Sequence, residues 1–215
     1  MKASTCSLKK GSLFLVIILF IGTLPSTFGR LTALRDIDLS SNSFSGTVPS
    51  GIGNFLSLTY LDLGRNSFSG PLPSTLYQLT NFSELYLTRT NVNGSIANEI
   101  GQLTNLIRYR MYRNQMSGTF PSQVGNLALV TLFDISYNLK MNGEPFVWST
   151  TPHLPSFSCL GTIPTEIGRM TSLQEFRIYQ NELTGTLPTS MGALTGLTLM
   201  MVKVNNLTGI LYTAP

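Results

Sequence analysis

Apolar residues recur along the chain at a fixed spacing of 24 positions. Two columns, separated by one intervening residue, illustrate this: Ile37, Leu61, Leu85 and Tyr109, and then Leu39, Leu63, Leu87 and Met111. The apolar–polar–apolar alternation predicts a short strand that buries one face and exposes the other. A fixed period of this length predicts stacked repeats, each of which buries its apolar face on its neighbours.

Polar and turn-forming residues hold fixed places after each predicted strand. Three residues beyond the second column stands an asparagine, replaced once by Thr90: Asn42, Asn66, Asn114, Asn138, Asn181 and Asn205. An amide both donates and accepts hydrogen bonds, so these side chains are expected to be buried and to satisfy inward-facing backbone groups. A glycine and an apolar–proline pair follow, as in Gly70 and Leu72-Pro73, and favour a turn and an extended return.

This module resembles the leucine-rich repeat family, in the subtype of plant receptor-like kinases and receptor-like proteins with the consensus LxxLxxLxLxxNxLxGxIPxxLGx. The resemblance covers roughly residues 22–211. It implies an α/β leucine-rich repeat solenoid with a parallel concave β-sheet and about seven 24-residue repeats. The side chains expected in its core include Leu61, Leu63, Leu85, Leu87, Ile135, Phe176 and Ile178.

Residues 1–21 support two interpretations. Lys9 and Lys10 precede an apolar run over residues 13–21, which is typical of a secretory signal peptide or membrane anchor. Alternatively, Leu13 and Leu15 fall one period before Ile37 and Leu39, which is the pattern of a degenerate first repeat. In either case the leucine-rich repeat domain is expected over residues 22–215.

An insertion interrupts the fifth unit. Between Asn138 and Gly161 lie 22 residues where other units have three, so the range 139–160 contains 19 extra residues. One interpretation is a functional loop, since insertions in repeats project from one face. The favoured interpretation is an inert or artefactual addition, because residues 155–160 read like the translated end of an unspliced intron. Deletion of 19 residues is therefore expected to be tolerated.

Composition narrows the possible chemistry. Charged residues make up 11% of the chain, and the formal charge of +4 includes Lys2, Lys9 and Lys10, so no nucleic-acid partner is indicated. Cys6 and Cys159 are the two cysteines and do not form a disulfide framework. With His153 as the single histidine, the sequence predicts no catalytic site, metal site or cofactor.

The solvent-facing strand positions form ladders on one face, and tyrosine and arginine concentrate in the central repeats. The predicted ligand-binding residues are Tyr86, Arg108, Arg110, Tyr112, Arg177 and Tyr179. Both residue types commonly anchor interfaces. We expect a protein or peptide ligand with acidic character, unless Glu84, Asp134 and Glu175 neutralise the arginines internally.

The resemblance implies non-catalytic recognition by an extracellular receptor-like protein or a fragment of a receptor kinase ectodomain. The alternative is a secreted inhibitor of cell-wall-degrading enzymes, similar to polygalacturonase inhibitors. Either protein would be secreted or at the cell surface. The N-terminal run and a missing C-terminal segment are the two possible membrane anchors. For a secreted chain, the predicted glycosylation sites are Asn81, Asn93 and Asn206, each in an Asn-x-Ser/Thr pattern.

Overall fold

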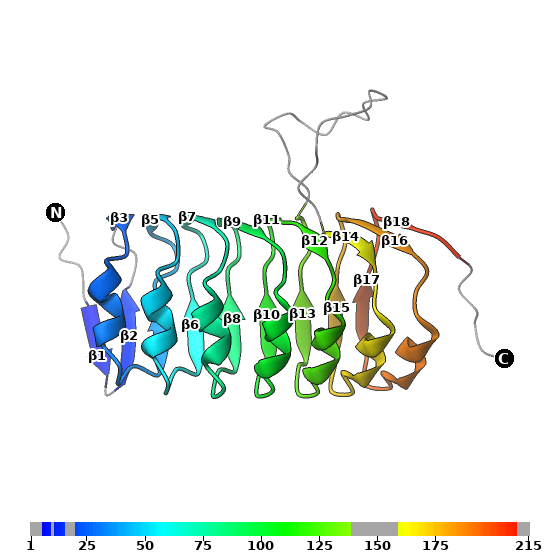
Figure 1. The fold of residues 1–215 in the computed structure, drawn as a ribbon, viewed down its shortest axis with the longest axis horizontal. Coiled ribbons are helices and arrows are strands. Elements are labelled where there is room, and N and C mark those ends of the chain that lie inside the picture. The colour runs from blue at the N-terminus through cyan, green and yellow to red at the C-terminus, as the bar shows by residue number, and fades with distance from the viewer. Residues whose placement is uncertain (1–5, 10, 16–19, 139–158, 210–215) are drawn as a thin grey trace, which may run out of the picture.

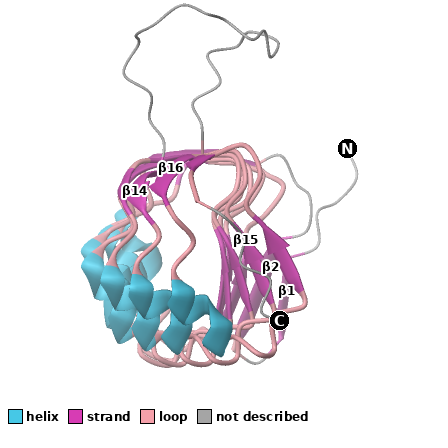
Figure 2. Cartoon of the chain, turned by 90° about the vertical axis from the view of Figure 1, so that its right-hand side faces the viewer, coloured by secondary structure: helices cyan, strands magenta, loops and turns pink. Residues whose placement is uncertain are grey.

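Each unit of the chain passes through a short strand, a second extended segment and a short helix before the next unit begins (Figure 1). The computed structural model describes residues 6–9, 11–15, 20–138 and 159–209 of the protein. Along the axis of the coil, the three kinds of segment form separate sides of a solenoid, with the helices opposite the largest sheet (Figure 2).

The first strand of each unit joins a nine-stranded sheet, here called the main sheet. In spatial order its strands are β1 (Cys6–Lys9), β2 (Ser12–Leu15), β4 (Asp36–Asp38), β6 (Tyr60–Asp62), β8 (Glu84–Tyr86), β10 (Arg108–Arg110), β13 (Leu132–Asp134), β15 (Glu175–Arg177) and β17 (Leu199–Met201). From β2 onward the pairing is parallel. Leu61 lies opposite Ile37 and Leu85, as the 24-residue period predicts.

The N-terminal edge of the main sheet departs from the expectation of purely parallel pairing. β1 runs antiparallel to β2 and covers what would otherwise be an open edge. β2 pairs with β4 in parallel and places Leu13 opposite Ile37, which is the register of a degenerate repeat. Residues 16–19, within the same apolar run, lie outside the described residues. A signal peptide or anchor over residues 1–21 therefore stays a prediction.

The second extended segments form two smaller parallel sheets, which the sequence pattern did not separate from irregular extended chain. One contains β3 (Ile21–Thr23), β5 (Ser43–Gly46), β7 (Ser67–Gly70), β9 (Asn91–Gly94) and β11 (Gln115–Met116). The other contains β12 (Gly118–Thr119), β14 (Cys159–Thr162), β16 (Glu182–Gly185) and β18 (Asn206–Leu207). The turn glycines lie on these strands, and Gly46 has a φ of 77°, a conformation that favours glycine.

The helices of the described residues are five-residue 3-10 helices. They are η1 (Ser26–Arg30), η2 (Ser50–Asn54), η3 (Ser74–Gln78), η4 (Asn98–Gln102), η5 (Ser122–Asn126), η6 (Thr165–Arg169) and η7 (Thr189–Ala193). A proline in extended conformation precedes each of them except η4, which follows Ala97. Because proline has a fixed φ and lacks an N–H, it keeps the chain extended after the strand and suits the position just before a helix.

A continuous apolar core lies between the three sides. The seven core residues expected from the sequence are each at most 1% exposed, which confirms both apolar columns. Aromatic rings extend the packing between units, as where Tyr109 stacks on Phe133 with ring centroids 5.1 Å apart. Burial of each such large apolar side chain contributes about 1.5–3 kcal/mol relative to exposure.

The asparagine column satisfies backbone groups that no strand reaches. Asn66 Nδ2 donates to the carbonyl oxygens of Leu39 at 2.9 Å and Leu63 at 3.0 Å, and its Oδ1 accepts the Phe44 N–H at 3.0 Å. Asn42, Asn66, Asn114, Asn138 and Asn181 are at most 8% exposed, as predicted. Asn205 makes the same kinds of bond but is half-buried, because it lies in the last described coil.

After the insertion, Asn181 keeps its bond to the preceding coil, where Nδ2 donates to the Ile135 carbonyl oxygen at 3.1 Å, but within the described part of the chain the bond to its Oδ1 is missing. In regular coils, Oδ1 of the asparagine accepts the N–H two residues beyond the preceding asparagine, as Asn138 does from Met116. Asn181 Oδ1 has no hydrogen-bond partner among the described residues, and residue 140, which would supply the N–H, lies outside them. The repeat register nevertheless resumes at β14, where Cys159 lies opposite Gly118 just as Phe68 lies opposite Gly46.

Replacement of Asn66 by alanine is expected to lower the free energy of unfolding by roughly 3 kcal/mol, because it leaves several buried backbone groups without partners. Chemical denaturation followed by circular dichroism measures this. Asn54→Ala, at an exposed helix end, serves as the control and should change the stability little. Equal effects of the two substitutions would contradict a special role for the column.

Deletion of residues 139–157 should leave the solenoid intact, because Asn138 is then separated from Gly161 by three residues as in other units. The Cys159 N–H would take the place of the missing donor to Asn181, so the free energy of unfolding should stay the same or rise by about 1 kcal/mol. Thermal unfolding of the two proteins compares them. A clear loss of stability would indicate that the inserted residues, including Trp148, pack on the solenoid.

Candidate ligand-binding face

The outward face of the main sheet carries the polar ladders that the sequence predicts. Arg108 on β10 lies between Glu84 and Leu132, and Arg110 lies between Tyr86 and Asp134. Because the β-strands are held by their backbone pairing and by the core beneath, this face is a rigid surface. Four of the six predicted binding residues lie on β8, β10 and β15. Tyr112 and Tyr179 follow β10 and β15 by two residues.

Each of the three predicted arginines pairs with a carboxylate. Arg108 Nη1 lies 3.3 Å from Glu84 Oε1, Arg110 Nε lies 3.3 Å from Asp134 Oδ2, and Arg177 Nη2 lies 2.6 Å from Glu175 Oε2. This is the internal neutralisation that the sequence left open. These arginines therefore do not favour an acidic ligand, since their charges are already compensated.

Glu84 joins two of the predicted residues into one polar cluster. It receives a hydrogen bond from the Tyr86 hydroxyl at 2.7 Å and both of its oxygens lie 3.3 Å from Arg108 Nη1. Burial and the bond to Glu84 raise the pKa of Tyr86 to about 12. The hydroxyl is therefore protonated at neutral pH and acts as a donor.

Tyr112 and Tyr179 belong to a second group, in which they interact with each other and with a third tyrosine. Tyr137 lies edge-on to both, with ring centroids 5.1 Å from Tyr112 and 5.0 Å from Tyr179. The Arg113 guanidinium lies 5.5 Å from the centroid of the Tyr137 ring. These four side chains form an aromatic and cationic patch, here called the tyrosine cluster.

Tyr137 was missed from the sequence because it lies outside the strand ladders. The residue immediately before each asparagine, or before Thr90 in its place, adopts a left-handed backbone, with φ between 53° and 57°: Ser41, Arg65, Arg89, Arg113, Tyr137, Gln180 and Val204. Non-glycine residues rarely adopt this conformation. The recurrence of arginine and tyrosine at this position was the available signal.

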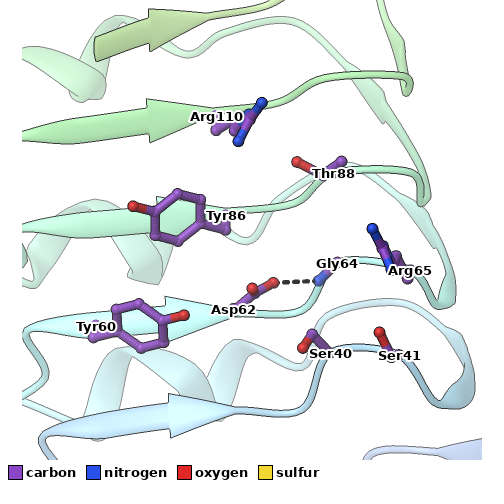
Figure 3. A pocket seen from close by; sticks show the side chains of 9 residues that line it. All are labelled: Ser40, Ser41, Tyr60, Asp62, Gly64, Arg65, Tyr86, Thr88 and Arg110. Atoms are coloured by element: carbon purple, nitrogen blue, oxygen red, sulfur yellow. Dashed lines mark hydrogen bonds between the residues drawn. The ribbon is translucent and has the colours of Figure 1, made fainter.

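A groove of about 420 Å³ opens on the same face nearer the N-terminus (Figure 3). Its lining spans four coils: Ser40, Ser41, Tyr60, Asp62, Gly64, Arg65, Tyr86, Thr88 and Arg110. Only Tyr86 and Arg110 belong to the predicted set. The Tyr60 and Tyr86 rings lie on neighbouring strands at one side, with centroids 5.6 Å apart.

Asp62 is the acidic group of this groove. Its Oδ1 accepts the Gly64 N–H at 2.7 Å, as the dashed line in Figure 3 shows. Burial, followed by repulsion from Asp38, raises the pKa of Asp62 to about 6, although the Gly64 bond and the charges of Arg65 and Arg110 act in the opposite direction. Within the described residues, no cation lies within ion-pair distance of Asp62.

Comparison with known proteins identifies the repeat. The leucine-rich repeat family model matches residues 33–55 and 57–79. The structure of PEPR1–AtPEP1 superposes with a TM-score of 0.79 and 30% identity, over 95% of this chain and 26% of that one. The protein is a plant-type leucine-rich repeat protein.

Other solved structures are similar to this leucine-rich repeat protein. The plant peptide hormone receptor RGFR1 in complex with RGF2 gives a TM-score of 0.77 at 28% identity, covering 88% of this chain and 27% of that one. The Arabidopsis receptor kinase HAESA, in complex with the peptide hormone IDA and the co-receptor SERK1, gives 0.70 at 28% identity, covering 92% and 34%. The chain thus spans about a quarter to a third of these structures. No curated protein matches it by sequence.

The remaining candidate sites of the leucine-rich repeat protein are peripheral to this face. Among the glycosylation candidates, Asn81 and Asn206 are exposed, whereas Asn93 is half-buried within β9. In the described part of the chain, no three His, Cys, Asp or Glu side chains gather where they could bind a metal. No helix among the described residues has the length and apolar character needed to cross a bilayer.

The raised pKa of Asp62 makes the stability of this leucine-rich repeat protein depend on pH. The folded state binds the Asp62 proton more tightly than the unfolded chain does, so this group lowers stability progressively as pH rises from about 4 to about 6. Asp62→Asn should therefore raise the melting temperature at pH 7 and leave it nearly unchanged at pH 4. Glu99→Gln, on exposed η4, is the charge-matched control and should show no such difference.

Proposed function

We propose that the protein recognises a protein or peptide ligand on the outward face of the main sheet, as an extracellular receptor-like protein or part of a receptor kinase ectodomain. The proposed contacts are those predicted from the sequence: Tyr86, Arg108, Arg110, Tyr112, Arg177 and Tyr179. The observation that carries the proposal is the concentration of tyrosine and arginine on one rigid sheet face. Such side chains dominate binding energy at interfaces.

The geometry suits recognition rather than catalysis. A sheet face supported by a packed core needs no loop ordering, so little conformational entropy is lost on binding. The arginines are held by their carboxylates and the tyrosines by their ring contacts, which fixes their orientation before a ligand arrives. A peptide that lies across the strands can contact both the Glu84 cluster and the tyrosine cluster.

The likeness to peptide hormone receptors supports this assignment. RGFR1 and HAESA are described with bound peptide hormones, and HAESA also with a co-receptor. The chain spans only part of those proteins. By analogy with them, we propose that it has a peptide partner and lies at the cell surface or outside the cell. The alternative of an inhibitor of wall-degrading enzymes has no comparable support.

The proposal is tested with peptides selected on the immobilised protein from a displayed random library. Arg110→Ala with Tyr112→Ala should weaken the selected peptides by roughly 2 kcal/mol or more, about 30-fold, as expected for anchor residues. Isothermal titration calorimetry measures the affinities. Arg169→Ala, on the helical side, is the matched control and should leave affinity unchanged.

Arg110→Ala also leaves the carboxylate of Asp134, which is 1% exposed, without its partner. Tyr112→Ala alone therefore gives a second reading, and circular dichroism checks that each variant is folded. A change within about 0.5 kcal/mol in folded variants would exclude this face as the ligand site.

A further inference from the structure

We infer that the groove at Asp62 binds a cationic group, the guanidinium of an arginine or the ammonium of a lysine, carried by a peptide ligand. This rests on the proposed function and specifies the chemistry of one part of its site. The cation would pair with Asp62 Oδ2 and lie beside Asp38, with the tyrosine rings at its side.

Asp134 occupies a position equivalent to that of Asp62 in another repeat, and it is paired with a cation. Asp62 and Asp134 occupy the same ladder, and each accepts the N–H of the residue two positions later on Oδ1, Gly64 for Asp62 and Ser136 for Asp134. Asp134 Oδ2 then pairs with Arg110 Nε at 3.3 Å, from the preceding strand of the sheet. Asp62 Oδ2 has no such partner among the described residues.

Asp134 has Arg110 directly opposite it on the preceding strand, whereas Asp62 has a second acid, Asp38, at the equivalent position. Asp38 lies directly opposite Asp62 on β4, and its Oδ1 accepts only the Ser40 N–H among the described groups. Like charges directly opposite each other across a sheet are unfavourable. Arg65 and Arg110 are near enough to act on Asp62 electrostatically, but neither forms an ion pair with it, and Arg110 is paired with Asp134. A ligand cation would compensate two carboxylates at once.

The shape of the groove also fits such a group. Gly64 lines the hollow, and a larger residue would not fit there without a shift: a Cβ would lie 3.0 Å from Asp62 Oδ1 and 3.0 Å from the Thr88 carbonyl oxygen. The neighbouring rungs of this ladder are Ser40 and Thr88, which are larger. Tyr60 and Tyr86 border the same hollow, and aromatic faces attract guanidinium and ammonium groups. The volume of about 420 Å³ lies within the range of small-ligand pockets, about 300–1,000 Å³.

The test compares two capped tripeptides, alanine–arginine–alanine and alanine–citrulline–alanine, which differ in charge but hardly in shape. Titration of each into the isotopically labelled protein is followed by the NMR shift of the Gly64 amide, the group bonded to Asp62. We expect saturable binding of the arginine peptide and at least tenfold weaker binding of the citrulline peptide. Asp62→Asn should lower the affinity for arginine at least tenfold, and Glu99→Gln should not change it.

The same titration at lower pH gives a second readout. The titratable and charged groups around Asp62 are Asp38, Tyr60, Arg65, Tyr86 and Arg110. The pKa of Asp62 is about 6, so its carboxylate is largely protonated at pH 5. Affinity for the arginine peptide should fall about tenfold between pH 7 and pH 5, as the fraction of ionised Asp62 does. Binding of the citrulline peptide should not depend on pH over this range.

Equal binding of the two tripeptides, the absence of any shift with arginine, or an unchanged affinity in folded Asp62→Asn would overturn the inference. These outcomes are separable from failure of the proposed function. If the groove does not bind cations but the proposed function is right, library-selected peptides still lose affinity in Tyr112→Ala. If the proposed function is wrong but the groove binds cations, the arginine tripeptide still shifts the Gly64 amide.

Discussion

The structure depends on the need to pair backbone groups that point inward where each strand ends. The strand ladder of the main sheet stops at those points, and the buried carbonyl oxygens of Leu39 and Leu63 would be costly without donors. Except where Thr90 takes its place, one asparagine per coil pairs these groups, and Asn66 reaches both its own coil and the preceding one. The coils are thus joined by side-chain amides as well as by strands, and Asn181 keeps this link across the insertion through the Ile135 carbonyl oxygen. The left-handed residue before each asparagine is part of the same device, because it turns the amide inward at a cost in backbone energy.

Because the core and the asparagines hold the coils together from inside, the outward face of the main sheet can vary with function. Inward positions of β6, β8 and β10 are fixed by the core, whereas the residues between them point outward and bond ladder neighbours, residues of the same strand or nearby backbone N–H groups. Acidic, basic and aromatic residues can therefore replace one another there without disturbing the coil. The left-handed positions add one more row, and it contributes Arg113 and Tyr137 to the tyrosine cluster.

The period in the sequence was sufficient to predict the buried columns, the asparagine column and the strand register, since each depends only on position within the repeat. Leu61, Asn66 and the pairing of Arg110 with Tyr86 across strands all follow from a shift of 24 residues. Features that depend on side-chain direction or on departures from the repeat could not be predicted in this way. The antiparallel β1 belongs to no unit, the ion pair of Arg110 with Asp134 depends on rotamers, and the groove is lined by side chains from four coils.

The separation between the groove and the tyrosine cluster sets the scale of a ligand that uses both. Asp62 lies on β6, and Tyr137 follows β13, three strands further along the sheet. Neighbouring strands are about 4.8 Å apart, so the two sites are separated by roughly 14 Å along the axis. An extended peptide advances about 3.3 Å per residue, and therefore covers this distance in four or five residues. The cationic side chain would then lie at one end of such a segment and an apolar or aromatic side chain at the other. This spacing constrains the ligand sequence more tightly than the overall charge of the face does, because the central arginines between the two sites are already paired.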